Sequence, residues 1–228
     1  LLLPDRRIKN SNVKNKIKRW YWCGVFGELY GSANETRYVN DVVGVMNWLN
    51  GGELPKTIVD SYFNPMRLLM LQSRRSAAYK GIVALIMKNH SRDFISGQEM
   101  DLVLYKAAGI DIHHIFPKNY CKSKGYDYIK WDSIINKTPL SYSTNREIGG
   151  VAPSEYLARI EKKKVEQTDL RDYLASHWID MADCVSDDFE RFIVHRARKI
   201  LDAIANVTGK PISGRDSDEV REKFGEIL

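Results

Sequence analysis

One short stretch of the chain places two imidazole groups side by side, and two isolated asparagines follow it. Residues 111–117 contain the adjacent pair His113 and His114, and Asn136 and Asn145 come after them. Nowhere else in the sequence do two histidines stand side by side. Imidazole nitrogens and carboxamide oxygens both bind divalent metal ions. The stretch therefore predicts a small metal site.

The local pattern around these residues predicts two strands followed by a short helix. The run 110–116 has its apolar side chains at Ile110, Ile112, Ile115 and Phe116, three of them β-branched, and the proline after it limits the run, as in a strand. A polar, lysine-bearing loop is expected over residues 118–133, and a second strand over residues 134–140. Ser143 or Thr144 then begins a short helix that a glycine pair ends. We expect a mainly α-helical scaffold that carries this small α+β insert.

Hydrolysis of a phosphodiester bond suits this set of groups. The reaction needs an activated water, a Lewis acid on the phosphate and stabilisation of the leaving oxygen. Histidine is a natural general base because its ordinary pKa is near working pH. Adjacent strand residues point to opposite faces, so His113 and His114 reach one point only where the strand ends, which Pro117 favours. We expect Asn136 to hold their loop and Asn145 to direct its carbonyl at a metal.

The flanking sequence has the apolar spacing of amphipathic helices. Helices are expected, in order, over residues 14–30, 40–49, 64–71, 77–87, 153–160 and 189–204. The chain up to residue 108 is expected to be helical, and the tail from Lys210 onward to be polar and loosely held. The regions 1–108, 109–160 and 161–228 are expected to form one compact unit, with the α+β insert in the middle.

The composition of the chain indicates which classes of protein it can belong to. With 228 residues, 43% of them hydrophobic, the chain can bury a core. Its apolar runs are too short to cross a bilayer, and no signal peptide is seen. Three widely spaced cysteines support neither a zinc ribbon nor a disulfide framework, and suit the reducing cytoplasm. A net charge of +6 and a pI near 9.1 permit a polyanionic partner.

The sequence reads His113-His114-Ile115-Phe116-Pro117, then Asn136-Lys137, then Asn145-Arg146. This order resembles the motif of HNH (ββα-metal) nucleases, and the separation of the two asparagines is the one in the HNH domains of CRISPR effector nucleases. The resemblance places the motif in residues 109–160, with His114 as general base and Asn136 as orienting residue. It implies that His113 and Asn145 hold a divalent metal, with Mg²⁺ expected. The commonest motif has Asp where His113 stands, and a neutral ligand there favours Mn²⁺, Ni²⁺ or Zn²⁺.

A narrower resemblance covers more of the chain. It rests on the histidine motif, on residues 145–157 and on the early aromatic pattern Trp20-Tyr21-Trp22…Phe26…Tyr30. These features resemble the C-terminal nuclease half of GmrSD-type modification-dependent restriction enzymes, an architecture that SspE-like phage-defence nucleases share. The resemblance implies an effector that nicks or cuts double-stranded phage or plasmid DNA. The implied partner is an upstream NTPase and sensor half, whose Asp-Gly-Gln-Gln-Arg motif is absent here, as in a fragment of a longer protein.

Four basic residues are candidates for contacts with the DNA backbone. Lys118, Lys122 and Lys124 lie in the expected loop beside the site, and Arg146 follows Asn145. Two other functions stay open. One is a non-catalytic helical DNA-binding domain with a degenerate metal finger, and the other is an RNA-cleaving HNH toxin. No membrane partner is expected for any of the three.

Overall fold

The computed structural model describes residues 9–31, 35–101, 110–163 and 165–228 of the chain. Within them, its elements are α2 (Ser11–Gly27), α3 (Glu35–Leu49), α4 (Lys56–Asp60), α5 (Arg67–Met70), α6 (Ala77–Lys88), β1 (Ile110–His114), α8 (Lys118–Lys124), α9 (Tyr128–Trp131), the 3₁₀-helix η1 (Ile134–Asn136), β2 (Lys137–Ser141), α10 (Tyr142–Ile148), α11 (Pro153–Lys162), α12 (Gln167–Ser176), α13 (Met181–Val185), α14 (Phe189–Thr208) and α15 (Asp218–Phe224). The described chain is thus mainly helical with one two-stranded antiparallel sheet, which confirms the predicted class of a helical scaffold with a small β part. None of the described helices is both long and apolar enough to cross a membrane.

The sheet and the helix after it follow the predicted order, with different bounds. β1 pairs with β2 from Ile110 opposite Ser141 to His114 opposite Lys137. The first strand ends at His114, and the second begins only at Lys137, because η1 occupies the residues before it. Ser141, and not Ser143 or Thr144, caps α10: its side chain accepts a hydrogen bond from the Thr144 N–H at 3.2 Å.

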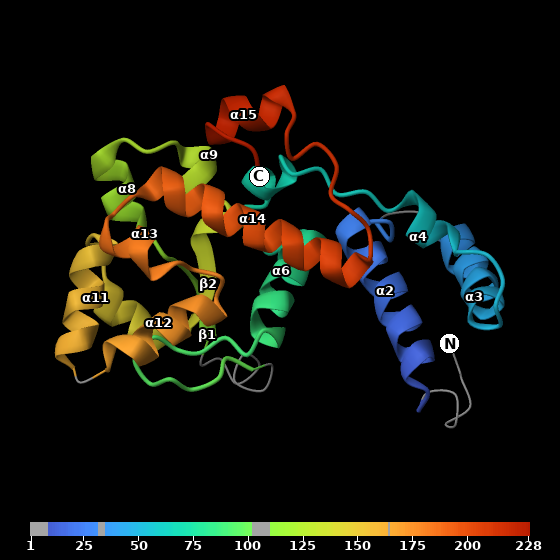
Figure 1. Ribbon diagram of the computed structural model, residues 1–228, viewed down its shortest axis with the longest axis horizontal. Coiled ribbons are helices and arrows are strands. Elements are labelled where there is room, and N and C mark those ends of the chain that lie inside the picture. The colour runs from blue at the N-terminus through green and yellow to red at the C-terminus, as the bar shows by residue number, and fades with distance from the viewer. Residues whose placement is uncertain (1–8, 32–34, 102–109, 164) are drawn as a thin grey trace.

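The long helix α14 connects the two sides of the molecule. It contacts α2 and α6 on one side and η1 and α13 on the other, and Figure 1 shows it running from the α8–α13 side toward α2. The predicted apolar stripe of this helix is buried, as the structure shows for Phe189, Ile193, Ala197, Ile200 and Ile204. Through its contact with η1, the helix α14 also packs against the segment that leads into β2.

The N-terminal helices begin and end for local reasons. The Asn10 side chain caps α2 by accepting hydrogen bonds from the N–H groups of Asn12 and Val13. The helix α6 matches the predicted range 77–87 closely. By contrast, α3 begins at Glu35 and not near residues 40–41, because Asp41 is a buried residue inside the helix that accepts a 2.6 Å hydrogen bond from Thr57.

Three predicted stretches are wrong. The expected loop 118–133 contains α8 and α9, since Gly125 ends the first with φ 70° and Asp127 caps the second. The expected helix at 64–71 is only the single turn α5. Residues 89–101, expected to be helical, form turns and one isolated bridge between Arg92 and Glu99. Residues 102–108, also predicted helical, lie outside the described part of the chain.

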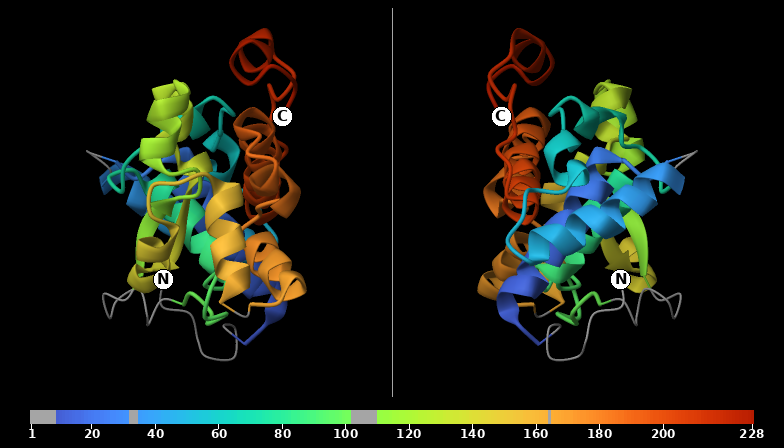
Figure 2. Two further views of the ribbon diagram at one scale, coloured as in Figure 1. Left: turned by 90° about the vertical axis from the view of Figure 1, so that its left-hand side faces the viewer. Right: turned by 90° about the vertical axis from the view of Figure 1, so that its right-hand side faces the viewer.

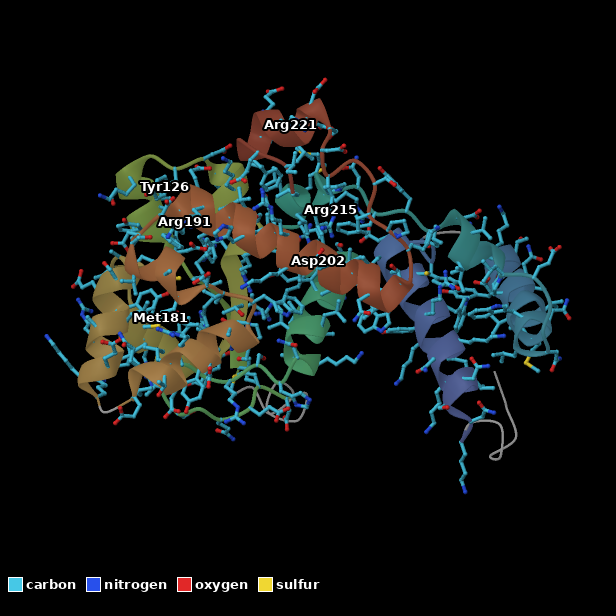
Figure 3. All side chains as sticks on the ribbon, viewed as in Figure 1. Tyr126, Met181, Arg191, Asp202, Arg215 and Arg221 are labelled. Carbon is cyan, nitrogen blue, oxygen red and sulfur yellow. The ribbon has the colours of Figure 1, made fainter. Side chains whose placement is uncertain are left out.

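The C-terminal tail packs against α14, contrary to the prediction of a loosely held segment. Val220, Phe224 and Leu228 are buried, and the Arg215 guanidinium lies 2.7 Å from the Asp202 carboxylate of α14, both labelled in Figure 3. Figure 2 shows α15, in red, at the edge of the molecule. The tail contains too few apolar residues to reveal this packing in a hydrophobic pattern.

His177 is a buried neutral histidine that makes the fold sensitive to acid. Its Nδ1 lies 2.6 Å from Thr138 Oγ1 on β2, and its Nε2 lies 2.8 Å from the Arg92 carbonyl oxygen. Burial lowers the pKa of His177 from 6.5 to about 3. Between these values the unfolded chain binds a proton that the folded protein does not, so folding weakens as the pH falls below 6.5.

We expect His177→Gln to flatten this acid dependence. The wild type should lose about 1.4 kcal/mol of unfolding free energy per pH unit from this residue between pH 6 and pH 4, and the variant should not. Urea unfolding of both proteins at several pH values measures the difference in slope, in which the contributions of the carboxylates cancel. Equal slopes for the two proteins would contradict the assignment of a neutral His177.

Candidate metal and hydrolysis site

An open pocket of about 290 Å³ lies where β1 ends. Its walls include His113, His114 and Asn145, so the structure brings both histidines and the second asparagine to one place. The remaining lining residues are Ile112, Pro117, Lys118, Asn119, Gly149 and Gly150. Both histidines reach the pocket because His114 is the last residue of the strand, so the alternation of faces ends with it.

Asn136 fixes the chain directly after the histidines. This fully buried residue accepts a hydrogen bond from the Phe116 N–H at Oδ1 and donates from Nδ2 to the Phe116 carbonyl, at 2.8 and 2.9 Å. Its own carbonyl accepts the Ile115 N–H at 2.9 Å, and its Nδ2 also donates to the Trp131 carbonyl at 2.9 Å. Asn136 thus holds the turn that ends β1, as the sequence predicted.

A buried arginine donates hydrogen bonds to the backbone on both sides of Asn136. Arg196 of α14 is 1% exposed, and its Nη1 donates to the carbonyl oxygens of Ile135 and Lys137, the residues on either side of Asn136. Its Nε donates to the His177 carbonyl at 3.2 Å. Burial lowers the pKa of Arg196 to about 9, yet it remains a cation at neutral pH. Nothing in the sequence pattern pointed to this residue, which occupies a core position of an amphipathic helix.

His113 presents an unpaired ring nitrogen. The residue is 8% exposed, and its Nε2 is buried without a hydrogen-bond partner among the described residues. Burial holds the pKa of His113 below its ordinary value, which favours the neutral imidazole that metals bind. The Tyr142 ring packs edge-on against it, with centroids 6.5 Å apart.

Asn145 faces the same pocket from the other side of the insert. It lies half-buried on α10 and lines the pocket, and its carboxamide has no hydrogen-bond partner among the described residues. A ring nitrogen and a carboxamide oxygen that both lack protein partners fit a divalent metal with a sparse protein shell. The residues present therefore fit the implied metal.

His114 is paired with a carboxylate that sequence reasoning missed. Its Nε2 lies 3.1 Å from Asp132 Oδ1, and its ring packs edge-on against Trp131 with centroids 5.7 Å apart. Burial lowers the pKa of His114 below its ordinary value, and the hydrogen bond to Asp132 partly opposes that effect. Asp132 lies at the C-terminal end of α9, inside the stretch predicted to be a loop, so no periodicity marked it.

Asp132 itself is held by two more residues. Lys137 Nζ lies 2.9 Å from Oδ1, and the Tyr128 hydroxyl donates to Oδ2 at 3.1 Å. Burial raises the pKa of Asp132, but the hydrogen bond and charge of Lys137 and the hydrogen bonds of His114 and Tyr128 together hold that pKa below its usual value. Asp132 is therefore a carboxylate at neutral pH.

The predicted DNA-contact residues are exposed and differ in their distance from the pocket. Lys118 lines it. Lys122 and Lys124 lie on the exposed surface of α8, with Lys124 Nζ 5.6 Å from the centre of the Tyr120 ring. Arg146 is exposed on α10 next to Asn145. The structure thus places one of the four at the pocket and leaves the other three on surfaces of α8 and α10, outside its lining.

A second group of potential metal ligands lies away from this pocket. Asp180, Asp183 and His195 have ligand atoms within 4.8 Å of one another. The buried Asp183 already pairs with Arg191 at 2.6 Å and with His195 at 2.8 Å, and Figure 3 labels Arg191 on α14. Because a guanidinium already neutralises this carboxylate, the group needs no ion to satisfy its charge.

The chain is similar to a known archaeal protein over most of its own length. The chain is similar to an uncharacterized protein of the archaeon Methanocaldococcus jannaschii, with 30% identity over 217 residues that cover 83% of this chain and 37% of the archaeal protein. The chain thus spans little more than a third of the length of that relative. No family model matches the chain, and no solved structure matches it significantly. A functional inference therefore has to come from the geometry of the site.

Proposed function

We propose that this chain is a metal-dependent HNH DNA endonuclease. The observation that carries the proposal is the shared pocket at the end of β1. It joins the unpaired Nε2 of His113, the carboxylate-bound ring of His114 and the unpaired carboxamide of Asn145. The proposal is also supported by the order of β1, β2 and α10, with α8, α9 and η1 between the strands, because a ββα-metal finger has two strands followed by a helix.

His113 and Asn145 would hold the metal. A divalent cation bound there would act as a Lewis acid on the scissile phosphate and stabilise the charge on the leaving oxygen. Mg²⁺ is the expected ion, because it keeps several waters and needs few protein ligands. An imidazole in place of a carboxylate also suits Mn²⁺ or another transition metal.

His114 supplies the base. A water beside its ring gives a proton to the imidazole as the water oxygen forms a bond to phosphorus and the bond to the 3′-oxygen breaks. The 3′-oxygen then takes up a proton from solvent. Asn136 keeps the turn after His114 in place for this step.

The basic residues around the pocket would bind the DNA backbone. Lys118 at the pocket lining is the candidate for the phosphate nearest the cut. Lys122, Lys124 and Arg146 extend the positive surface along α8 and α10. Loss of any one of these exposed cations should weaken binding to all DNA sequences alike and lower its salt dependence.

The proposed biological setting rests on the resemblance to GmrSD-type restriction enzymes. We place the chain as the cytoplasmic effector part of an anti-phage restriction system, acting on phage or plasmid DNA by nicking or double-strand cleavage. The archaeal relative supports a role for this chain beside further domains, because the match covers only 37% of the length of that relative. An NTPase and sensor region outside the matched part is the proposed partner.

Incubation of the protein with supercoiled plasmid and with RNA tests the proposal. We expect nicked or linear plasmid with Mg²⁺ or Mn²⁺ and intact plasmid with EDTA. Plasmid that stays intact with every metal but shifts in a mobility assay would favour a non-catalytic DNA-binding domain. Cleavage of RNA with intact plasmid would favour a toxin that uses the same residues.

We expect His113→Ala to weaken Mn²⁺ binding by about 10-fold or more, as loss of a metal-site residue does. The variant removes the only ring nitrogen that the pocket leaves buried and unpaired among the described residues. Electron paramagnetic resonance of free Mn²⁺ measures the dissociation constant without DNA. His90→Ala is the matched control, because His90 is an exposed histidine away from the pocket. Equal affinities for wild type and His113→Ala would remove His113 from the metal site.

A further inference from the structure

The pairing of His114 with Asp132 determines which ring nitrogen carries the proton. A carboxylate accepts hydrogen bonds but has no proton to donate. Asp132 Oδ1 lies 3.1 Å from His114 Nε2 and 2.9 Å from the ammonium of Lys137. The neutral ring must therefore carry its proton on Nε2, which leaves the lone pair on Nδ1.

We propose that Asp132 is a positioning residue that holds His114 as the Nε2–H tautomer and presents Nδ1 as the atom that takes the proton from water. This inference rests on the proposed nuclease function and adds a residue to it. Asp132 does not touch the reacting atoms and acts only through the His114 ring. It sets the ring orientation and the tautomer in the way that carboxylates set functional histidines elsewhere.

The backbone that carries Asp132 is tied to the backbone that follows His114. The Nδ2 group of Asn136 donates to the carbonyl oxygens of both Phe116 and Trp131, each at 2.9 Å. Trp131 directly precedes Asp132, so one carboxamide sets the separation between the carboxylate and the histidine. The Asp132 N–H also donates to the Tyr128 carbonyl at 3.0 Å.

Lys137 and Tyr128 complete the arrangement. Lys137 also donates to the Gln72 carbonyl at 2.8 Å and is 7% exposed, so its charge stays beside Asp132. The Tyr128 hydroxyl occupies the other carboxylate oxygen. With both oxygens bound, the carboxylate cannot rotate freely, and Oδ1 stays directed at the His114 ring.

Nitrogen-15 NMR of the imidazole groups in the full chain tests the proposal without metal or DNA. In the wild type we expect the His114 Nε2 proton to exchange slowly and the Nδ1 resonance to be that of an unprotonated nitrogen. Asp132→Ala should remove the slow exchange and introduce the other tautomer. Asp132→Asn keeps an acceptor oxygen and should retain the signal, and His90→Ala, at an exposed histidine outside the pocket, should leave it unchanged.

The same variants are then compared in plasmid cleavage. Asp132→Ala should lower kcat by about 10-fold or more with unchanged KM for DNA, while circular dichroism shows an intact fold. His90→Ala should cleave at the wild-type rate, because His90 does not line the pocket. A His114 signal that is the same in the wild type and in Asp132→Ala would overturn the proposal, whatever the cleavage result. If the wild type cuts no DNA, the nuclease function fails and the catalytic role of Asp132 with it, while the tautomer measurement still decides whether Asp132 orients the ring.

Discussion

His114→Ala is expected to lower the rate of plasmid cleavage by at least about 100-fold, the contribution typical of a general base. The imidazole is half-buried at the pocket, and its partner Asp132 holds it in one orientation. Removing it leaves the unpaired groups of His113 and Asn145 in place, so metal binding and DNA binding should persist. Single-turnover cleavage at saturating DNA measures the chemical step.

The control for this prediction is a histidine of the same chain with no place in the pocket. His90→Ala should cleave at the wild-type rate, because His90 is exposed and does not line the pocket. A gel-shift titration in EDTA should give the same DNA affinity for wild type and His114→Ala. Undiminished cutting by His114→Ala would remove His114 from the role of base.

The second large expected effect is a loss of stability, which should be large for Asn136 and small for Asn145. Asn136→Ala should reduce the unfolding free energy by about 3–5 kcal/mol, because buried backbone groups that lose their partners cost about 1–3 kcal/mol each. The groups affected are the Phe116 N–H, the Phe116 carbonyl and the Trp131 carbonyl. The variant should also lose cleavage, since the turn after His114 is no longer held.

Asn145→Ala is the matched comparison. Its side chain makes no hydrogen bond among the described residues, so its unfolding free energy should change by no more than about 0.5 kcal/mol. Its cleavage should nevertheless fall, because a ligand of the metal is gone. Urea unfolding of both variants without metal gives the comparison, and equal destabilisation of the two would show that the asparagines do not have these separate roles.

The sequence predicted the parts of the fold that have strong local signals. The helix α6 and the stripe of α14 have clear apolar periodicity and were placed correctly. The two strands were found, although β1 ends at His114, because the hydrogen bonds of Asn136 turn the chain earlier than Pro117 does. The gathering of His113, His114 and Asn145 around one pocket was also expected.

The rest of the fold and of the site depends on contacts between residues that are distant in the sequence, which a local sequence pattern does not reveal. The helices α8 and α9 each bury one residue, Cys121 and Trp131, so the stretch looked like a polar loop. Asp132 was missed because its partner His114 lies 18 positions away in the chain. Arg196 was missed because its carbonyl acceptors at Ile135 and Lys137 become neighbours only after folding.

The most direct measurement of the central claim is the metal-dependent conversion of supercoiled plasmid by the wild type beside His114→Ala. We predict nicked or linear product with Mg²⁺ or Mn²⁺ for the wild type, none with EDTA, and at least about 100-fold slower conversion by the variant. Plasmid that stays supercoiled under every metal, or product that forms equally with both proteins, would contradict the assignment of this pocket as a nuclease site.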